Sequence, residues 1–306
     1  MTGAAETAER EAPAEPEVRS VGPWRQAIRR FRRQRLGVAA LLVLVVIFAA
    51  GALASVVAPY GYNEIHINLK HFGKAQPPTF DGRHFFGTDD AGKDVLSQTL
   101  YGIRTSVKVA VSVAGLAGLI GIVIGALAGY YGGWIDSVLA RVVDTVISFP
   151  ALLVLLAAFS TLRGLGLKEI GAILVVLLWT SVARVVRASF LSLREREYVE
   201  AARAMGASDL RIIVRHLLPN SVGPIIVVVT SVVGQAILLE ATVDFFGYGI
   251  YSAVTPTLGN LVADSLRDLG TTSWWLYTFP TAAIVTILLC VNYVGDSLDR
   301  ALNPRA

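Results

Sequence analysis

Long apolar runs alternate with shorter polar connectors along almost the whole chain. A helix needs about 20 mostly apolar residues to cross roughly 30 Å of hydrocarbon, and several of these runs reach that length. A soluble protein of this size would have shorter apolar runs. The pattern therefore predicts an all-α integral membrane protein with six transmembrane helices, at about Leu36–Ala58, Ser106–Ala128, Ile135–Ser160, Ile170–Val186, Val222–Ala241 and Trp275–Val294.

The polar segments divide the chain into regions. Residues 1–22 are rich in Ala, Glu and Pro and have no apolar face, so we expect a disordered cytoplasmic tail. The other expected regions are a basic flank with the first span (23–58), an extracytoplasmic segment (59–105), a five-helix core (106–298) that includes a connector at 194–219, and a cytoplasmic tail (299–306).

The first apolar run permits an alternative interpretation. Ala52-Leu53-Ala54 could serve as a signal-peptidase site, which would make this run a cleaved signal. The run is longer than the usual signal core of about 7–15 residues, and it continues past that site. We therefore favour a retained transmembrane helix.

Composition and charge agree with a membrane protein and indicate its orientation. The chain is 54% hydrophobic and only 16% charged, against roughly 25% charged in soluble domains. Arginines gather before the first span, in residues 23–35, and in the connector after the fourth span, in residues 187–219. Basic flanks stay inside the cell, so both termini and this connector should be cytoplasmic. This placement favours a role in topology over nucleic-acid binding, and Cys290 and the scattered histidines predict no metal site.

Small residues recur in the second span. Gly121, Gly125 and Gly129 are four residues apart and therefore share one face of a helix. Such a stripe lets two membrane helices approach closely. We expect another span to pack against it.

The connector after the fourth span reads as two helices joined by a turn. Tyr198, Ala201, Ala202 and Met205 share the spacing of one helical face, and Gly206 is suited to end that helix. Ser208 or Asp209 can cap a second helix, which should stop at Pro219. The residues alone leave two interpretations open, an amphipathic connector resting on the membrane or a docking site for a partner.

Glu200-Ala201-Ala202, then Gly206 after three residues, and later His216-Leu217-Leu218-Pro219 resemble the EAA loop of bacterial binding-protein-dependent ABC permeases. This family usually has an aliphatic residue in place of His216, although His is common in its peptide-permease branch. The resemblance implies a type I importer (MetI-like) fold with a cytoplasmic helix–turn–helix coupling segment that docks on an ATPase subunit. The implied coupling residues are Glu200, Ala201, Ala202, Arg203, Gly206, Asp209, His216 and Pro219.

Further motifs place the resemblance in the dipeptide, oligopeptide and nickel branch, in its second, or "C", permease subunit. The matching segments are Phe86–Ser97, Gly132–Asp136, Arg141–Asp144 and Asn292–Asp296. Residues 243–249 depart from the apolar Leu-Ser-Phe-Leu-Gly-Leu-Gly of the branch, and this departure concerns the pore lining after the fifth span.

The resemblance implies a subunit that forms half of a peptide pathway and is not an enzyme. The implied partners are a homologous second permease, two cytoplasmic ATPases that bind ATP and Mg²⁺, an extracytoplasmic substrate-binding protein, and the lipid of a bacterial cytoplasmic membrane. Consistent with this, the chain has no phosphate-binding Gly-x4-Gly-Lys-Ser/Thr loop. Nickel is an alternative cargo, because nickel importers share these motifs.

Two other classes of protein compete with this interpretation. A membrane-embedded enzyme would have to use His216, Arg215 and Glu200, but these lie on the connector. A secondary transporter needs ionisable residues within its spans, and Glu240 and Asp244 near the end of the fifth span are the candidates. The same two acids are the expected contacts along the substrate path, or else an interfacial or subunit-contact pair.

Overall fold

The computed structural model describes residues 23–66, 74–79, 84–161, 166–248, 255–266 and 272–302. The predicted tail at 1–22 and the end of the chain after Leu302 lie outside the described residues. The helices are α1 (Pro23–Arg33), α2 (Arg35–Ala52), α3 (Ala54–Val57), α4 (Val95–Tyr131), α5 (Gly133–Ser148), α6 (Ala151–Thr161), α7 (Leu167–Leu193), α8 (Glu197–Ala204), α9 (Asp209–Ile212), a π-helical turn η2 (Ile213–Leu217), α10 (Leu218–Phe245), α11 (Leu258–Ser265) and α12 (Trp275–Leu302).

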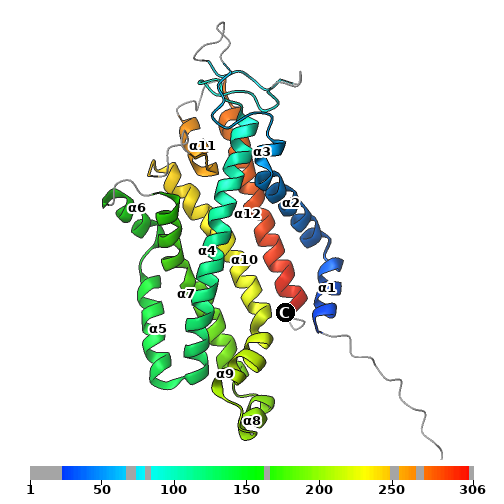
Figure 1. The fold of residues 1–306 in the computed structure, drawn as a ribbon, viewed down its shortest axis with the longest axis vertical. Coiled ribbons are helices and arrows are strands. Elements are labelled where there is room, and N and C mark those ends of the chain that lie inside the picture. The colour runs from blue at the N-terminus through cyan, green and yellow to red at the C-terminus, as the bar shows by residue number, and fades with distance from the viewer. Residues whose placement is uncertain are drawn as a thin grey trace, which may run out of the picture.

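The long helices form an elongated bundle in which α4, α7, α10 and α12 run side by side (Figure 1). Helix α2 packs on α12 and α4, and α5 lies along α7 and α4. One end, here called the α8 end, carries α1, α8, α9 and the last turn of α12; the other, the α11 end, carries α3, α11 and the polar residues before α4 (Figure 1). The N-terminal basic flank, the long connector and the end of α12 therefore share one side, as the charge pattern predicted.

Five helical stretches in the described chain are long and apolar enough to span a membrane, and α5 with α6 makes a sixth if that bent pair counts as one span. The span predicted over 135–160 consists of two helices, because α5 and α6 meet at 71°. Pro150 lies at the break, and the residue before it, Phe149, is extended at φ −89° and ψ 124°. A proline disfavours helical backbone in the residue before it and lacks an N–H, so the helix must restart after it.

Helix α4 is longer than its apolar core. It begins at Val95, before the predicted span at Ser106, because Asp94 caps it by accepting a hydrogen bond from the Ser97 N–H. Its 37 residues extend about 55 Å at 1.5 Å per residue, well beyond the hydrocarbon thickness. The first turns of α4 therefore reach into the α11 end.

The glycine stripe of α4 packs against α7, as the spacing predicted. A Cβ atom on Gly121 would lie 2.6 Å from the Trp179 carbonyl oxygen, and one on Gly125 would lie 2.5 Å from that of Ala183. No side chain fits at such distances, so the two helices touch through their backbones. At the α8 end, the Arg187 guanidinium binds the Asp136 carboxylate and so also ties α5 to α7.

Candidate functional site

The α8–α9 hairpin turns at Gly206. This residue has φ +79°, a left-handed conformation that glycine adopts without strain. The Ala207 N–H donates to the Ala202 carbonyl and the Gly206 N–H to the Arg203 carbonyl, which is the hydrogen-bond pattern of a Schellman cap. The prediction that Gly206 ends the first connector helix is confirmed. Ser208 precedes α9 but makes no capping bond through its side chain.

Helix α8 packs against the chain through two of its side chains. Val199 and Ala202 are buried and, with Ile212 of α9, face the rest of the chain. Tyr198, Ala201 and Met205 are exposed, Met205 to 82% of its surface. Of the four residues that share one face by spacing, only Ala202 packs against this chain, because Val199 supplies the other buried side chain of α8. Ala202 packs within the chain, whereas Ala201 is open to the surroundings.

The hairpin is fixed to the end of α4. The Tyr130 hydroxyl donates to the Asp209 carboxylate at 2.6 Å, and the Arg194 guanidinium donates to the Gly129 carbonyl at 3.4 Å. Asp209 is thus tied to this chain through its side chain. Tyr130 and Asp209 are far apart in the sequence, so no local spacing indicated their contact.

The second connector helix does not stop at Pro219, so that prediction was wrong. One helical stretch runs from Asp209 to Phe245 through the π-helical turn of η2. Proline lacks an N–H and its ring collides with the carbonyl four residues earlier, here that of Arg215. The wider turn just before Pro219 relieves this collision. The neighbouring carbonyls of His216 and Leu217 accept hydrogen bonds from the side chains of Asn220 and Ser221.

His216 and Glu200 differ in exposure. Glu200 and Arg203 are exposed on α8, while His216 is partly buried and its ring centroid lies 6.5 Å from that of Tyr198. The structure therefore presents Glu200, Ala201, Arg203, Met205 and Gly206 together as one open surface, here called the hairpin tip. Ala202 is buried beneath this surface, Asp209 is exposed beside it and held by Tyr130, and Pro219 belongs to the helix behind it.

Glu240 and Asp244 lie one turn apart near the α11 end of helix α10 and are only 1% and 3% exposed. The Ser106 hydroxyl donates to one Glu240 oxygen at 3.2 Å, and the Thr257 hydroxyl donates to Asp244. The Leu258 N–H donates in turn to the Ser106 oxygen at 3.2 Å. In this conformation α11 and α4 therefore enclose both carboxyl groups.

Helix α11 lies directly on this pair of acids. A Cβ atom on Gly259 would lie 2.5 Å from the Ala241 Cα atom and 2.8 Å from the Asp244 Cβ atom. Thr257 caps α11 by accepting from the Asn260 N–H, and the same hydroxyl reaches Asp244. Sequence reasoning found the two acids but not α11, which covers them.

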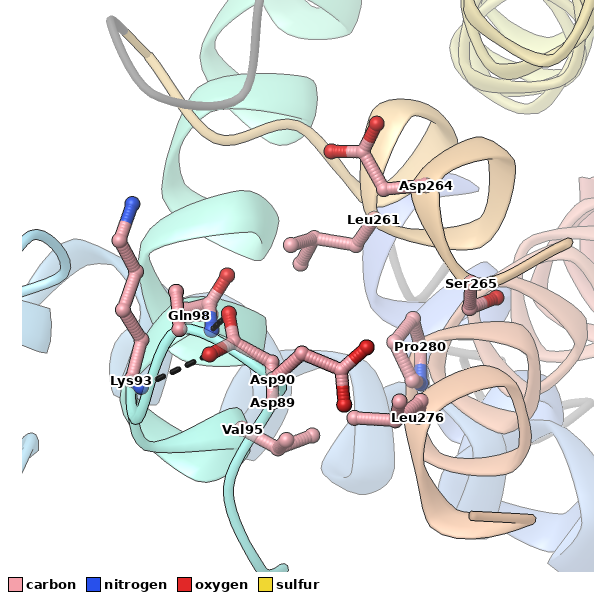
Figure 2. Close-up of a pocket in the computed structure, with 11 residues that line it drawn as sticks. Asp89, Asp90, Lys93, Val95, Gln98, Leu261, Asp264, Ser265, Leu276 and Pro280 are labelled. Atoms are coloured by element: carbon pink, nitrogen blue, oxygen red, sulfur yellow. Dashed lines mark hydrogen bonds between the residues drawn. The ribbon is translucent and has the colours of Figure 1, made fainter. Parts of the chain in front are cut away.

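A pocket of about 360 Å³ opens beside α11 (Figure 2). Asp89 is held there by the Lys93 N–H at 2.8 Å and by the Gln98 amide at 2.9 Å, with Asp264 of α11 on the other side (Figure 2). Burial raises the pKa of Asp89, although its hydrogen bonds oppose that shift. The Phe86–Ser97 motif thus serves to cap α4 and to line this pocket.

The fold and these two ends define a multi-pass helical membrane protein with an exposed hairpin at one end. The family of binding-protein-dependent transport system inner membrane components matches residues 121–306, and the N-terminal transmembrane domain of oligopeptide transport permease C matches residues 22–78. The chain belongs to this family of transport permeases.

Several relatives match the chain over most of its length. The dipeptide transport system permease protein DppC of Bacillus subtilis is 36% identical over 94% of this chain and 87% of its own length. The oligopeptide transport system permease protein OppC of Mycobacterium tuberculosis is 36% identical over 90% of this chain and 93% of its own. The fold is similar to that of a chain in an inward-facing structure of the MetNI methionine ABC transporter, with a TM-score of 0.56 at 19% identity, covering 68% of this chain and 97% of that one.

Proposed function

We propose that this chain is one permease subunit of an ATP-driven peptide importer. It forms half of the translocation path, and a homologous second permease forms the other half. The peptide assignment is supported by relatives that match most of the chain and are named as oligopeptide and dipeptide transport permeases. Two ATPase subunits bind ATP and Mg²⁺, a substrate-binding protein delivers the peptide, and this chain carries out no catalysis itself.

The α8 end faces the cytoplasm of a bacterium, and the chain resides in the cytoplasmic membrane. The support is the concentration of arginines at that end, in α1, at the end of α7 and in α8 and α9, because basic residues beside spans are retained inside. Both termini are then cytoplasmic. The polar residues before α4 and helix α11 face the substrate-binding protein.

The single observation that carries the coupling role is the hairpin tip. It is exposed and has little side-chain bulk at Ala201 and Gly206, yet its base is fixed by Val199, Ile212 and the Tyr130–Asp209 hydrogen bond. Two apolar side chains, Met205 and Leu210, are exposed on either side of the turn at Gly206, and neighbouring exposed apolar side chains on a rigid support are typical of a surface that another protein covers. Because the second half of the hairpin continues into α10, a force on the tip moves a membrane helix directly.

Site-specific photo-crosslinking tests this proposal. A photoreactive amino acid at Met205 should capture an ATPase subunit in the assembled complex, whereas one at Leu119, which is exposed on the apolar part of α4, should not. The complex should also hydrolyse ATP only when that subunit is present, and should take up a labelled dipeptide. Capture of lipid alone at Met205, or uptake driven by an ion gradient without ATP, would contradict the proposal.

A further inference from the structure

A groove of about 700 Å³ lies at the α11 end, between α4 and the beginning of α7. The residues just before α11, Thr255 and Pro256, close one side of it. Its volume falls in the range of about 300–1,000 Å³ that is usual for small-molecule sites. The groove is separate from the acidic pocket beside Asp89 and from the buried pair Glu240 and Asp244.

Three basic side chains line this groove: Arg104, Lys108 and Lys168. In the part of the chain that the structure describes, none of them lies within ion-pair distance of a carboxylate. Glu169, the nearest acid in sequence, accepts a hydrogen bond from the Gly166 N–H at 2.8 Å. The N-terminus of α7 adds a partial positive charge at the same place. The groove therefore favours an anion.

The charges and the apolar surface of the groove are separated by depth. Lys108 is the last charged residue of α4, and the next charged residue in the sequence is Asp136 of α5. On α7, no charged residue lies between Glu169 and Arg184. These cations thus mark the level at which hydrocarbon begins. Deeper in the groove the lining becomes apolar, with Val113, Leu116 and Val175. A ligand with a charged head and an apolar tail matches this order.

We propose that this groove binds an acidic phospholipid, with its phosphate at Arg104, Lys108 and Lys168 and one acyl chain along Val113, Leu116 and Val175. Basic pockets between membrane helices at the cytoplasmic surface recognise anionic headgroups in this way, and the same attraction between opposite charges acts at the α11 end. A short peptide fits less well, because its ammonium group would need an acceptor of opposite charge and the groove lining contains no carboxylate. Tyr62 and Tyr101, whose ring centroids are 5.3 Å apart, border the site at the interfacial level where tyrosine is favoured.

Native mass spectrometry of the purified full-length chain with its co-purified subunits tests this proposal. The complex is reconstituted in phosphatidylcholine membranes with and without phosphatidylglycerol, and the lipids retained after extraction are counted. The wild-type complex should retain phosphatidylglycerol in preference to phosphatidylcholine. The double variant Lys108→Gln/Lys168→Gln should lose about 25-fold in that preference, since each basic side chain near a membrane surface contributes a factor of about five.

Two further variants control the experiment. Lys74→Gln removes an exposed positive charge at the same end but outside the groove, and should leave lipid retention unchanged. Leu116→Trp fills the apolar part and should reduce phosphatidylglycerol retention while the cations remain. Equal retention by the wild type and the double variant would overturn the proposal. So would displacement of the retained lipid by a short peptide, or binding of free glycerol phosphate as tight as that of the lipid.

Discussion

The two ends of α10 are built in opposite ways. At the α8 end the helix is preceded by a π-helical turn and an exposed hairpin tip, so the residues proposed to contact the ATPase lie on the outside. At the α11 end its two acids, Glu240 and Asp244, are enclosed by α4 and α11. An exposed end can meet another protein without rearrangement, whereas the enclosed acids become accessible only if α11 moves. The first end is therefore suited to receive force and the second to respond to it.

Substitution of Gly206 should have the largest effect on transport. Gly206→Trp should reduce import at least tenfold while the protein remains inserted, because no atom of this chain lies within 4 Å of the position of a Cβ atom there. The clash would be with the partner alone. Import into vesicles, together with the amount of inserted protein, measures this.

Gly133→Trp is a matched control for the Gly206 substitution. Gly133 also has a positive φ, +54°, and open space around its Cβ position, but it is the first residue of α5 and lies outside the hairpin tip. Both substitutions carry a similar backbone strain, of order 1–2 kcal/mol. Normal import by Gly206→Trp, or an equal loss of import in both variants, would show that the hairpin tip is not a special contact surface for the partner.

Gly259→Leu should cause the largest loss of stability at the opposite end. The new side chain would collide with Ala241 and Asp244, so α11 would be displaced and the buried acids exposed. Overpacking of this kind lowers the free energy of unfolding by about 1–3 kcal/mol. Thermal unfolding in detergent measures the change, and Gly115→Leu, where nothing lies within 4 Å, should leave the midpoint unchanged. Unaltered stability of Gly259→Leu would mean that α11 does not pack tightly on α10.

Tyr130→Phe should have a smaller effect, confined to the α8 end. It removes the hydrogen bond to Asp209 and should lower the free energy of unfolding by about 0.5–1.5 kcal/mol. Hydrogen exchange of the α8–α9 amides should become faster, while exchange in α11 stays the same. Equal loosening at both ends would show that the two ends are not independent.

Pro219→Ala should have the smallest effect. The π-helical turn already relieves the collision of the proline ring, so little strain is left to remove. We expect the free energy of unfolding to change by less than about 1 kcal/mol, although alanine favours helix by about 3 kcal/mol over proline in a regular helix interior. A gain near that larger value in thermal unfolding would show that the turn is strained.

Local patterns in the sequence were enough for part of this picture. The apolar runs located the long helices, the spacing of Gly121, Gly125 and Gly129 identified a close helix contact, and Gly206 marked the end of α8. Pro150 and Pro219 were harder to interpret. The first divides the predicted third span into two helices, and the second was accommodated where a helix end was expected. A proline forbids one hydrogen bond, but the surrounding packing decides whether the helix bends, widens or stops.

The sequence by itself determined where the spans lie, that the basic segments share one side of the bundle, and that the connector forms a hairpin. Each of these follows from the length of an apolar run, from local charge or from the conformation of a glycine, which are properties of neighbouring residues. Only the tertiary structure decided that Ala202 is buried while Ala201 is open, that Tyr130 holds Asp209, and that α11 covers Glu240 and Asp244. Those contacts join residues far apart in the chain. Their energies depend on which helices meet, and no local pattern contains that information.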